Sequence, residues 1–198
     1  VPGYKNDVVN TLRLWWPRPV TAFDLGLFNA GDHAGSVAAR NTAEHISRVL
    51  YPNDSGPAGK ELRLRQEYFF VSASLQDAVT RHLARWGTLD DLPEHNVFQL
   101  NDTHPALAVA EMMRILLDEH RFTWERAWAI THRSFAYTNH TLLPEALETW
   151  PVHMLDRLLP RQLDIIREID RRLVKQVSRH YPDDDERGSG PDQDAGSG

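Results

Sequence analysis

The sequence predicts an α/β fold, with a mostly parallel sheet flanked by helices. Short segments of strand length alternate along the chain with longer segments of helical period. Two of the short segments, residues 97–100 and 134–138, each run into a polar cluster and then into a helical segment. The first is expected to be a fully buried strand of a parallel sheet. Strands that alternate with helices in this way favour helices on both faces of the sheet.

The N-terminal half is predicted to contain one strand and three helices. Residues 8–16 alternate between apolar and polar side chains like a strand, and prolines end the alternation. A short helix is compatible with residues 25–29, and apolar side chains on one face predict a helix over 36–50. Residues 51–59 are dense in turn residues and are predicted to be a loop. A long helix over 61–86, apolar nearly all round in its middle, is expected to be buried on most sides.

The C-terminal half is predicted to add two strands and further helices. Thr123 is expected to be a helix N-cap. Prolines at 105, 144, 151 and 160 favour helix starts, because proline suits the first turn of a helix. The predicted elements are a strand at 97–100, helices at 105–120 and 123–133, a strand at 134–138 and helical segments from 143 to 181.

The composition of the chain limits the classes of protein to which it can belong. A chain of 198 residues with a net charge of −6 predicts one domain that does not bind nucleic acid. The absence of cysteine excludes disulfides and cysteine-ligated metal and fits a cytosolic protein, and no apolar run is long enough to span a membrane. Residues 1–182 are expected to form the domain, and the acidic, Gly/Ser-rich residues 183–198 are expected to be disordered. A first residue other than methionine favours a piece of a longer chain.

Polar side chains cluster where the two predicted parallel strands end. Asp102 and His104 follow the first strand, and His140, Thr141 and Glu148 follow the second. Because the carboxyl ends of parallel strands meet at one edge of a sheet, these residues predict a polar pocket of the kind that sugars need. Residues in both clusters could instead serve as helix caps, and this alternative stays open.

The loop at 51–59 is a third candidate. Asn53 and Asp54 could belong to a loop that gates a site, and Arg63 behind it could bind an anion. Alternatively, the loop is only a turn and the arginine lies on a solvated helix face. The histidines lack the spacing of a metal site, so no metal is expected.

Several segments, in the same order, resemble the α-glucan phosphorylases, the family of glycogen, starch and maltodextrin phosphorylases. The resemblance covers about residues 3–182. It is carried by residues 6–15, 43–54, 59–69, 99–105, 136–148, 150–151 and 159–161. It implies a Rossmann-like domain of the nucleotide-diphosphate-glycosyltransferase type, of which this chain would be the later part of the N-terminal domain.

The resemblance also implies an activity. The family transfers the terminal α-1,4-linked glucose of a glucan to orthophosphate, giving glucose 1-phosphate, and is cytoplasmic and usually homodimeric. It holds pyridoxal phosphate on a lysine of its C-terminal domain, and none of Lys5, Lys60 and Lys175 lies in that motif. The isolated chain is therefore expected to be inactive without the C-terminal domain of the same parent. Residues 81–82 read Arg-His where the animal enzymes have a double arginine for nucleotide activation, which favours a bacterial type.

The resemblance assigns roles to single residues. His140 would contact the bound glucose, and its carbonyl would stabilise the glucosyl cation as a catalytic group. Asp54 is counted as catalytic too, because it would order the gate loop, although Ser55 replaces an asparagine that often follows it in the family. The residues expected to bind substrate are Asp102, His104, Thr141, Asn53, Arg63 and Glu148.

Two other functions remain as alternatives. The chain by itself could be a non-catalytic, carbohydrate-binding α/β piece. A glycoside hydrolase would need two carboxylates that face each other across a cleft, such as Asp102 and Glu145. A helix-start position explains Glu145 more simply, and the order of the motifs supports phosphorolysis.

Overall fold

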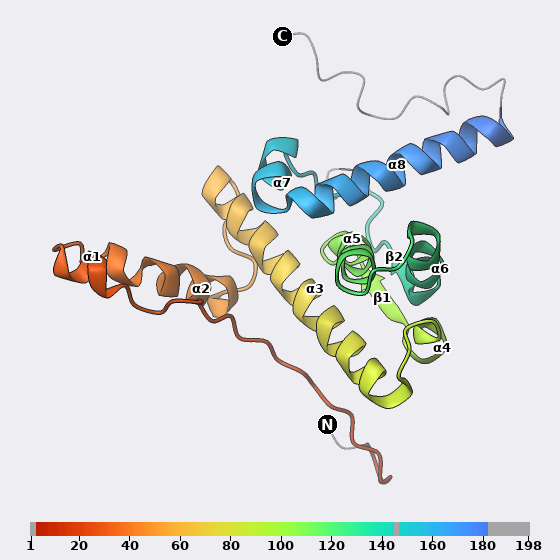
Figure 1. Cartoon of the computed structure of the whole chain (residues 1–198), viewed down its shortest axis with the longest axis horizontal. Coiled ribbons are helices and arrows are strands. Elements are labelled where there is room, and N and C mark those ends of the chain that lie inside the picture. Colours follow the sequence, from red (N-terminus) through yellow and green to blue (C-terminus); the bar gives the residue numbers. More distant parts are fainter. Residues whose placement is uncertain (1–2, 145–146, 182–198) are drawn as a thin grey trace. The chain divides into compact units, whose positions relative to one another are not determined.

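A computed structural model describes residues 3–144 and 147–181 of the chain (Figure 1). The chain divides into two compact units, which we describe separately as residues 3–74 and residues 75–181. The long helix α3 (Pro57–Trp86) contributes to both. None of the helices in the described ranges is long and apolar enough to cross a membrane. The predicted disordered tail at 183–198 lies outside the described residues.

Residues 3–74 contain the predicted helices. The short helix is confirmed as α1 (Leu25–Asn29), and Asp24 caps it because its Oδ1 accepts from the Leu27 N–H at 3.0 Å. The next helix is confirmed as the 3₁₀ turn η1 (Gly35–Val37) followed by α2 (Ala38–Arg48). Helix α3 begins four residues earlier than predicted, at Pro57, a residue that suits the first turn.

The strand predicted at residues 8–16 is wrong. In the structure this segment has only an isolated bridge at Val9 and otherwise no regular structure. The Trp15 indole N–H donates to the Ser74 hydroxyl at 3.1 Å, so this side chain is held by α3. Alternation of apolar and polar residues marks a segment that fits a strand, but a strand also needs a neighbour to pair with.

Residues 75–181 form a helix-rich α/β unit around a parallel pair of strands, which confirms the α/β class. Strand β1 pairs with β2 in parallel, with Phe98 opposite Phe135 and Asn101 opposite Thr138, and the connection between them is helical. The elements are α4 (Leu92–His95), β1 (Phe98–Asn101), α5 (Leu107–Arg114), the π-helical turn η2 (Ile115–Glu119), α6 (Trp124–Ser134), β2 (Phe135–Thr138), α7 (Val152–Leu158) and α8 (Pro160–His180).

The core of this unit lies on α5, which packs against α6 and α8. Six of the eight residues of α5 are buried. Glu111 is among them and is 0% exposed, yet it is fully paired. Its carboxylate accepts two hydrogen bonds from Arg114, at 2.8 and 2.9 Å, and one from Gln162 of α8 at 2.9 Å. A buried carboxylate persists only when such donors replace water.

Three predictions for this unit need correction. The first strand is not fully buried, because Leu100 is its one buried residue. Helix α5 begins at Leu107 rather than at Pro105, which lies in a turn before it. The stretch from 143 to 181 is not helical throughout: residues 147–150 are irregular, and residues 145–146 lie outside the described ranges.

The local helix signals in the same region are confirmed. The Thr123 side chain caps α6 by accepting from the Arg126 N–H. Pro151 precedes the first residue of α7, and Pro160 is the first residue of α8. Pro144 has 3₁₀-helical structure, and residues 145–146, which follow it, lie outside the described ranges.

Candidate functional site

The carboxyl ends of β1 and β2 meet at one edge of the parallel pair. The Asp102 backbone N–H donates to the Thr138 carbonyl at 2.8 Å, directly beyond the last paired residues. The Asp102 side chain then reaches across, and its Oδ1 accepts from the backbone N–H of His140 at 2.7 Å. The two predicted residues are therefore in direct contact, joined through a side chain and a backbone group.

The segment after β2 is held by short-range hydrogen bonds. Asn139 Nδ2 donates to the Thr141 carbonyl at 2.7 Å, and Asn139 Oδ1 accepts from the Thr141 N–H at 3.4 Å. The exposed His140 ring has Nε2 3.5 Å from Asn101 Oδ1. This arrangement leaves the His140 imidazole facing solvent beside the strand ends, where a ligand could reach it.

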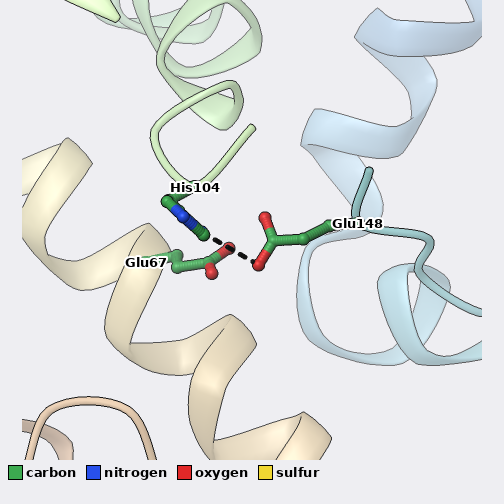
Figure 2. A group of neighbouring side chains, drawn as sticks. All are labelled: Glu67, His104 and Glu148. Carbon is green, nitrogen blue, oxygen red and sulfur yellow. Dashed lines mark hydrogen bonds and ion pairs between the residues drawn. The ribbon is translucent and has the colours of Figure 1, made fainter. Parts of the chain in front are cut away.

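Glu148 lies against the loop that follows β1. Its carboxylate accepts from the Thr103 hydroxyl at 3.1 Å, and its other oxygen is 3.2 Å from His104 Nδ1. Figure 2 shows the imidazole of His104 and the carboxylate of Glu148 pointing toward each other. The Glu148 side chain is 13% exposed and that of His104 is 38% exposed, so the carboxylate is the more shielded partner of this contact. Two predicted residues, His104 and Glu148, are thus in contact, and the Thr103 hydroxyl binds the same carboxylate.

The structure decides against helix capping by these side chains. Helix α5 has Ala106 as its N-cap residue and no side-chain cap. Asp102 and Thr103 bond instead to the segments after β2. Thr141 accepts from the Leu143 N–H at 3.4 Å, which forms a turn, and the 3₁₀ structure at Pro144 begins only three residues later, so Thr141 is not its N-cap residue.

The candidate gate loop belongs to residues 3–74. Asn53 Oδ1 accepts from the Ser55 N–H at 3.0 Å and from its hydroxyl at 2.7 Å, a turn that this short polar side chain favours. Asp54 is 2.8 Å from Arg63 Nη1, and Arg63 Nε is 3.2 Å from Glu67. The Arg63 guanidinium also lies 5.7 Å from the centre of the Tyr51 ring. The loop is therefore tied to the first turns of α3 by the arginine that sequence reasoning placed behind it.

Gly59 allows this loop to approach α3. A Cβ at this position would lie 1.8 Å from the Asn53 carbonyl oxygen, so no other residue fits without a displacement of the loop. Sequence reasoning missed this glycine, as it missed Thr103 and Asn139 as binding partners. The signal available was position alone: Gly59 is the last residue of the predicted loop, and Thr103 and Asn139 each lie next to a predicted site residue.

The eight predicted residues thus fall into two groups. Within residues 75–181 the structure brings together Asp102 with His140 and His104 with Glu148, and Thr141 follows His140 directly. Asn53, Asp54 and Arg63 form the other group, in residues 3–74. Glu145, the second carboxylate of the hydrolase alternative, lies outside the described residues.

Polar side chains at the carboxyl ends of parallel strands lie where open α/β folds bind their ligands. The family model for carbohydrate phosphorylases matches residues 1–190, and the chain belongs to this family. It is 52% identical over 185 residues to glycogen phosphorylase of Synechocystis sp., which covers 93% of this chain and 22% of that protein. It is 52% identical over 195 residues to the muscle form of glycogen phosphorylase from Ovis aries and 51% to the liver form from Homo sapiens, each covering 94% of this chain.

The chain is much shorter than these relatives. It spans 22% or 23% of their length. Their names describe whole enzymes, so the activity of the whole protein is a proposal for this chain.

Proposed function

We propose that this chain supplies the glucose-holding wall of an α-1,4-glucan phosphorylase. This enzyme would transfer the terminal glucosyl unit of a glucan to orthophosphate. The 52% identity to glycogen phosphorylases supports the reaction. The observation that carries the site is the 2.7 Å hydrogen bond from His140 N–H to Asp102, because it joins the two strand ends in the segments that carry the resemblance.

In the proposed reaction the bond between the anomeric carbon and the glycosidic oxygen breaks. A proton of orthophosphate goes to the departing oxygen, and a phosphate oxygen then bonds to the anomeric carbon, so the products are glucose 1-phosphate and a glucan shorter by one unit. The glucosyl group carries positive charge between these two events. The carbonyl dipole of His140 would stabilise that charge, because it is fixed before the reaction and need not reorganise.

The other residues would hold the glucosyl unit or order the loop near it. His104, Thr141 and Glu148 would hydrogen-bond sugar hydroxyls from the wall at the strand ends. Asn53, Asp54 and Arg63 would form the gate. The ion pair between Asp54 and Arg63, at 2.8 Å, supports an ordering role for Asp54, since its carboxylate is already neutralised by the arginine.

The resemblance implies pyridoxal phosphate as the cofactor, and the residues of this chain do not fit it. A lysine would have to hold this cofactor, and its amine needs an apolar or cationic surrounding to be uncharged. The three lysines of the sequence, Lys5, Lys60 and Lys175, all have exposed side chains. No step of the proposed reaction is therefore assigned to the cofactor. In the longer polypeptide that we propose as the parent, another domain would hold it.

The proposal also covers the domain type, the partners and the cellular location of the enzyme. The unit at 75–181 would be part of a Rossmann-like domain of the glycosyltransferase type. The partners would be an α-1,4-glucan, orthophosphate, the C-terminal domain of the same parent and a second copy of that parent. The protein would act in the cytoplasm.

The test is an assay of the full-length protein that carries this sequence. With maltodextrin, orthophosphate and pyridoxal phosphate we expect glucose 1-phosphate, and with the 198-residue chain alone we expect none. A full-length protein that releases free glucose or maltose without orthophosphate would be a hydrolase and would overturn the proposal. Product from the 198-residue chain alone would overturn the need for a further domain. Binding of maltodextrin by an otherwise inactive full-length protein would favour the non-catalytic alternative.

A further inference from the structure

We propose that Asp102 and Asn139 are positioning residues that fix the two peptide groups on either side of His140 and so aim its carbonyl oxygen. This inference rests on the proposed function, in which that oxygen faces the glucosyl cation. It assigns to Asp102 a role other than direct sugar binding, and it adds Asn139, to which sequence reasoning gave no role.

Asp102 holds the segment after β2 at two points. Its backbone N–H binds the Thr138 carbonyl at 2.8 Å, and its Oδ1 binds the His140 N–H at 2.7 Å. The two bonds enclose Asn139 and fix the plane of the peptide group that precedes His140. Because the acceptor is a carboxylate, the second bond is of the short, charge-assisted kind.

The backbone conformation of Asp102 is consistent with a requirement for its contact with His140. Its φ is 63°, in the left-handed region, where most side chains are disfavoured and aspartate and asparagine are tolerated. This conformation comes directly after β1 ends at Asn101. A residue that is held in a disfavoured backbone conformation at a strand end indicates that a local interaction requires this conformation. The hydrogen bond from the His140 N–H to Asp102 is such an interaction.

Asn139 fixes the peptide group that follows His140. Its Oδ1 accepts from the Thr141 N–H at 3.4 Å, and its Nδ2 donates to the Thr141 carbonyl at 2.7 Å. The carbonyl of His140 belongs to the same planar trans peptide as the Thr141 N–H, so the two point in opposite directions. With its N–H turned toward the Asn139 side chain, this peptide directs the His140 oxygen away from that side chain.

Two substitutions of Asp102 separate positioning from charge. Asp102→Asn keeps an acceptor oxygen and tolerates the left-handed backbone, whereas Asp102→Gly suits that backbone but removes the acceptor. In the full-length protein we expect Asp102→Gly to lower kcat about 100-fold, with KM for the glucan changed less than about threefold. Asp102→Asn should lose less than about tenfold in kcat. Asp7→Gly, in an exposed irregular segment, is the matched control.

A second measurement does not need activity. In the 198-residue chain, the His140 amide hydrogen should exchange slowly with solvent in the unchanged protein and in Asp102→Asn. In Asp102→Gly it should exchange at least about tenfold faster. Asn139→Ala should speed exchange of the Thr141 amide instead.

The outcomes separate the two proposals. Unchanged His140 exchange in Asp102→Gly would overturn the positioning role, as would equal losses of kcat in the glycine and asparagine variants. A large rise in KM for both variants would show that Asp102 binds the sugar directly. If the unchanged full-length protein forms no glucose 1-phosphate, the proposed function fails, and the exchange rates still decide whether Asp102 fixes the peptide.

Discussion

Helices α2 and α5 are of similar length, but they lie in different units and differ in burial. Helix α5, in residues 75–181, buries six of its eight residues, whereas α2, in residues 3–74, buries none of its eleven. Both have the apolar spacing of amphipathic helices. The difference teaches that apolar spacing decides which face can pack, and that a neighbouring element decides whether it does. The same holds for the segment before α1, where Leu12 and Leu14 are 73% and 83% exposed.

The comparison predicts a large difference in local stability. Backbone amides of α5 and α6 should exchange with solvent at least about 1,000-fold more slowly than those of α1 and α2 in the 198-residue chain. This ratio corresponds to about 4 kcal/mol of opening free energy. Hydrogen exchange followed by NMR or mass spectrometry measures it. Equal protection of the two pairs of helices would break the comparison.

A buried ion pair in α5 should sharpen the comparison between the two units. Glu111→Ala removes the acceptor of Arg114 and Gln162 and should lower the free energy of unfolding by about 3 kcal/mol. Glu111→Gln should cost less, since its amide oxygen still accepts. Urea unfolding measures both. The control is Glu125→Ala, whose side chain is 75% exposed where it pairs with Arg172, and its cost should be much smaller. A Glu111→Ala cost as small as that of the control would contradict the prediction.

Two glycine substitutions test how tightly the gate loop packs in residues 3–74, the less buried unit. Gly59→Ala should cost about 1–3 kcal/mol, because the new Cβ meets the Asn53 carbonyl and must displace the gate loop. Gly56→Ala, three residues earlier, meets no atom within 4 Å and should stay within about 0.5 kcal/mol of the unchanged chain. Unfolding curves give the cost, and faster backbone motion at Ser55 would report the displaced loop. Similar values for the two variants would show that the loop adjusts freely.

The smallest expected effect is a pH dependence on the surface of α8. Hydrogen bonds from Arg171 and then Arg172 lower the pKa of Glu168 to about 2, from an ordinary value of 4.5. Because the folded pKa is the lower one, the interaction stabilises the helix fully above pH 4.5 and is lost as the pH falls through about 2. NMR titration of the Glu168 carboxyl group measures the pKa, and added salt should raise it. A pKa near 4.5 would show that these exposed pairs do not persist in solution.

Sequence reasoning succeeded where a structure is set by adjacent residues. Thr123 caps the helix that directly follows it, and Pro160 begins α8, so their signals are local and were readable. Strand β2 was also found. The strand expected at 8–16 failed because strand formation depends on a distant partner, and the alternating pattern does not contain that information.

Like the fold, the candidate site was predictable only in part. The rule that parallel strands end at one edge of a sheet brought Asp102 and His140 together before any coordinates were known. It did not reveal that Asp102 binds a backbone N–H, or that Thr103 and His104 meet Glu148, because these contacts depend on the path of the loops. The residue types in both groups are those that the resemblance implies, and their roles in binding are proposals.

The π-helical turn η2 has a consequence for chain length. Here His120 N–H donates to the carbonyl of Ile115, five residues back rather than four, so the turn contains one residue more than an α-helix needs. Removing one residue between 115 and 119 would let α5 continue as regular helix, whereas the same deletion within α5 would rotate its buried face by about 100°. The turn is therefore a place in this unit where a residue can be lost while the core on α5 stays in register.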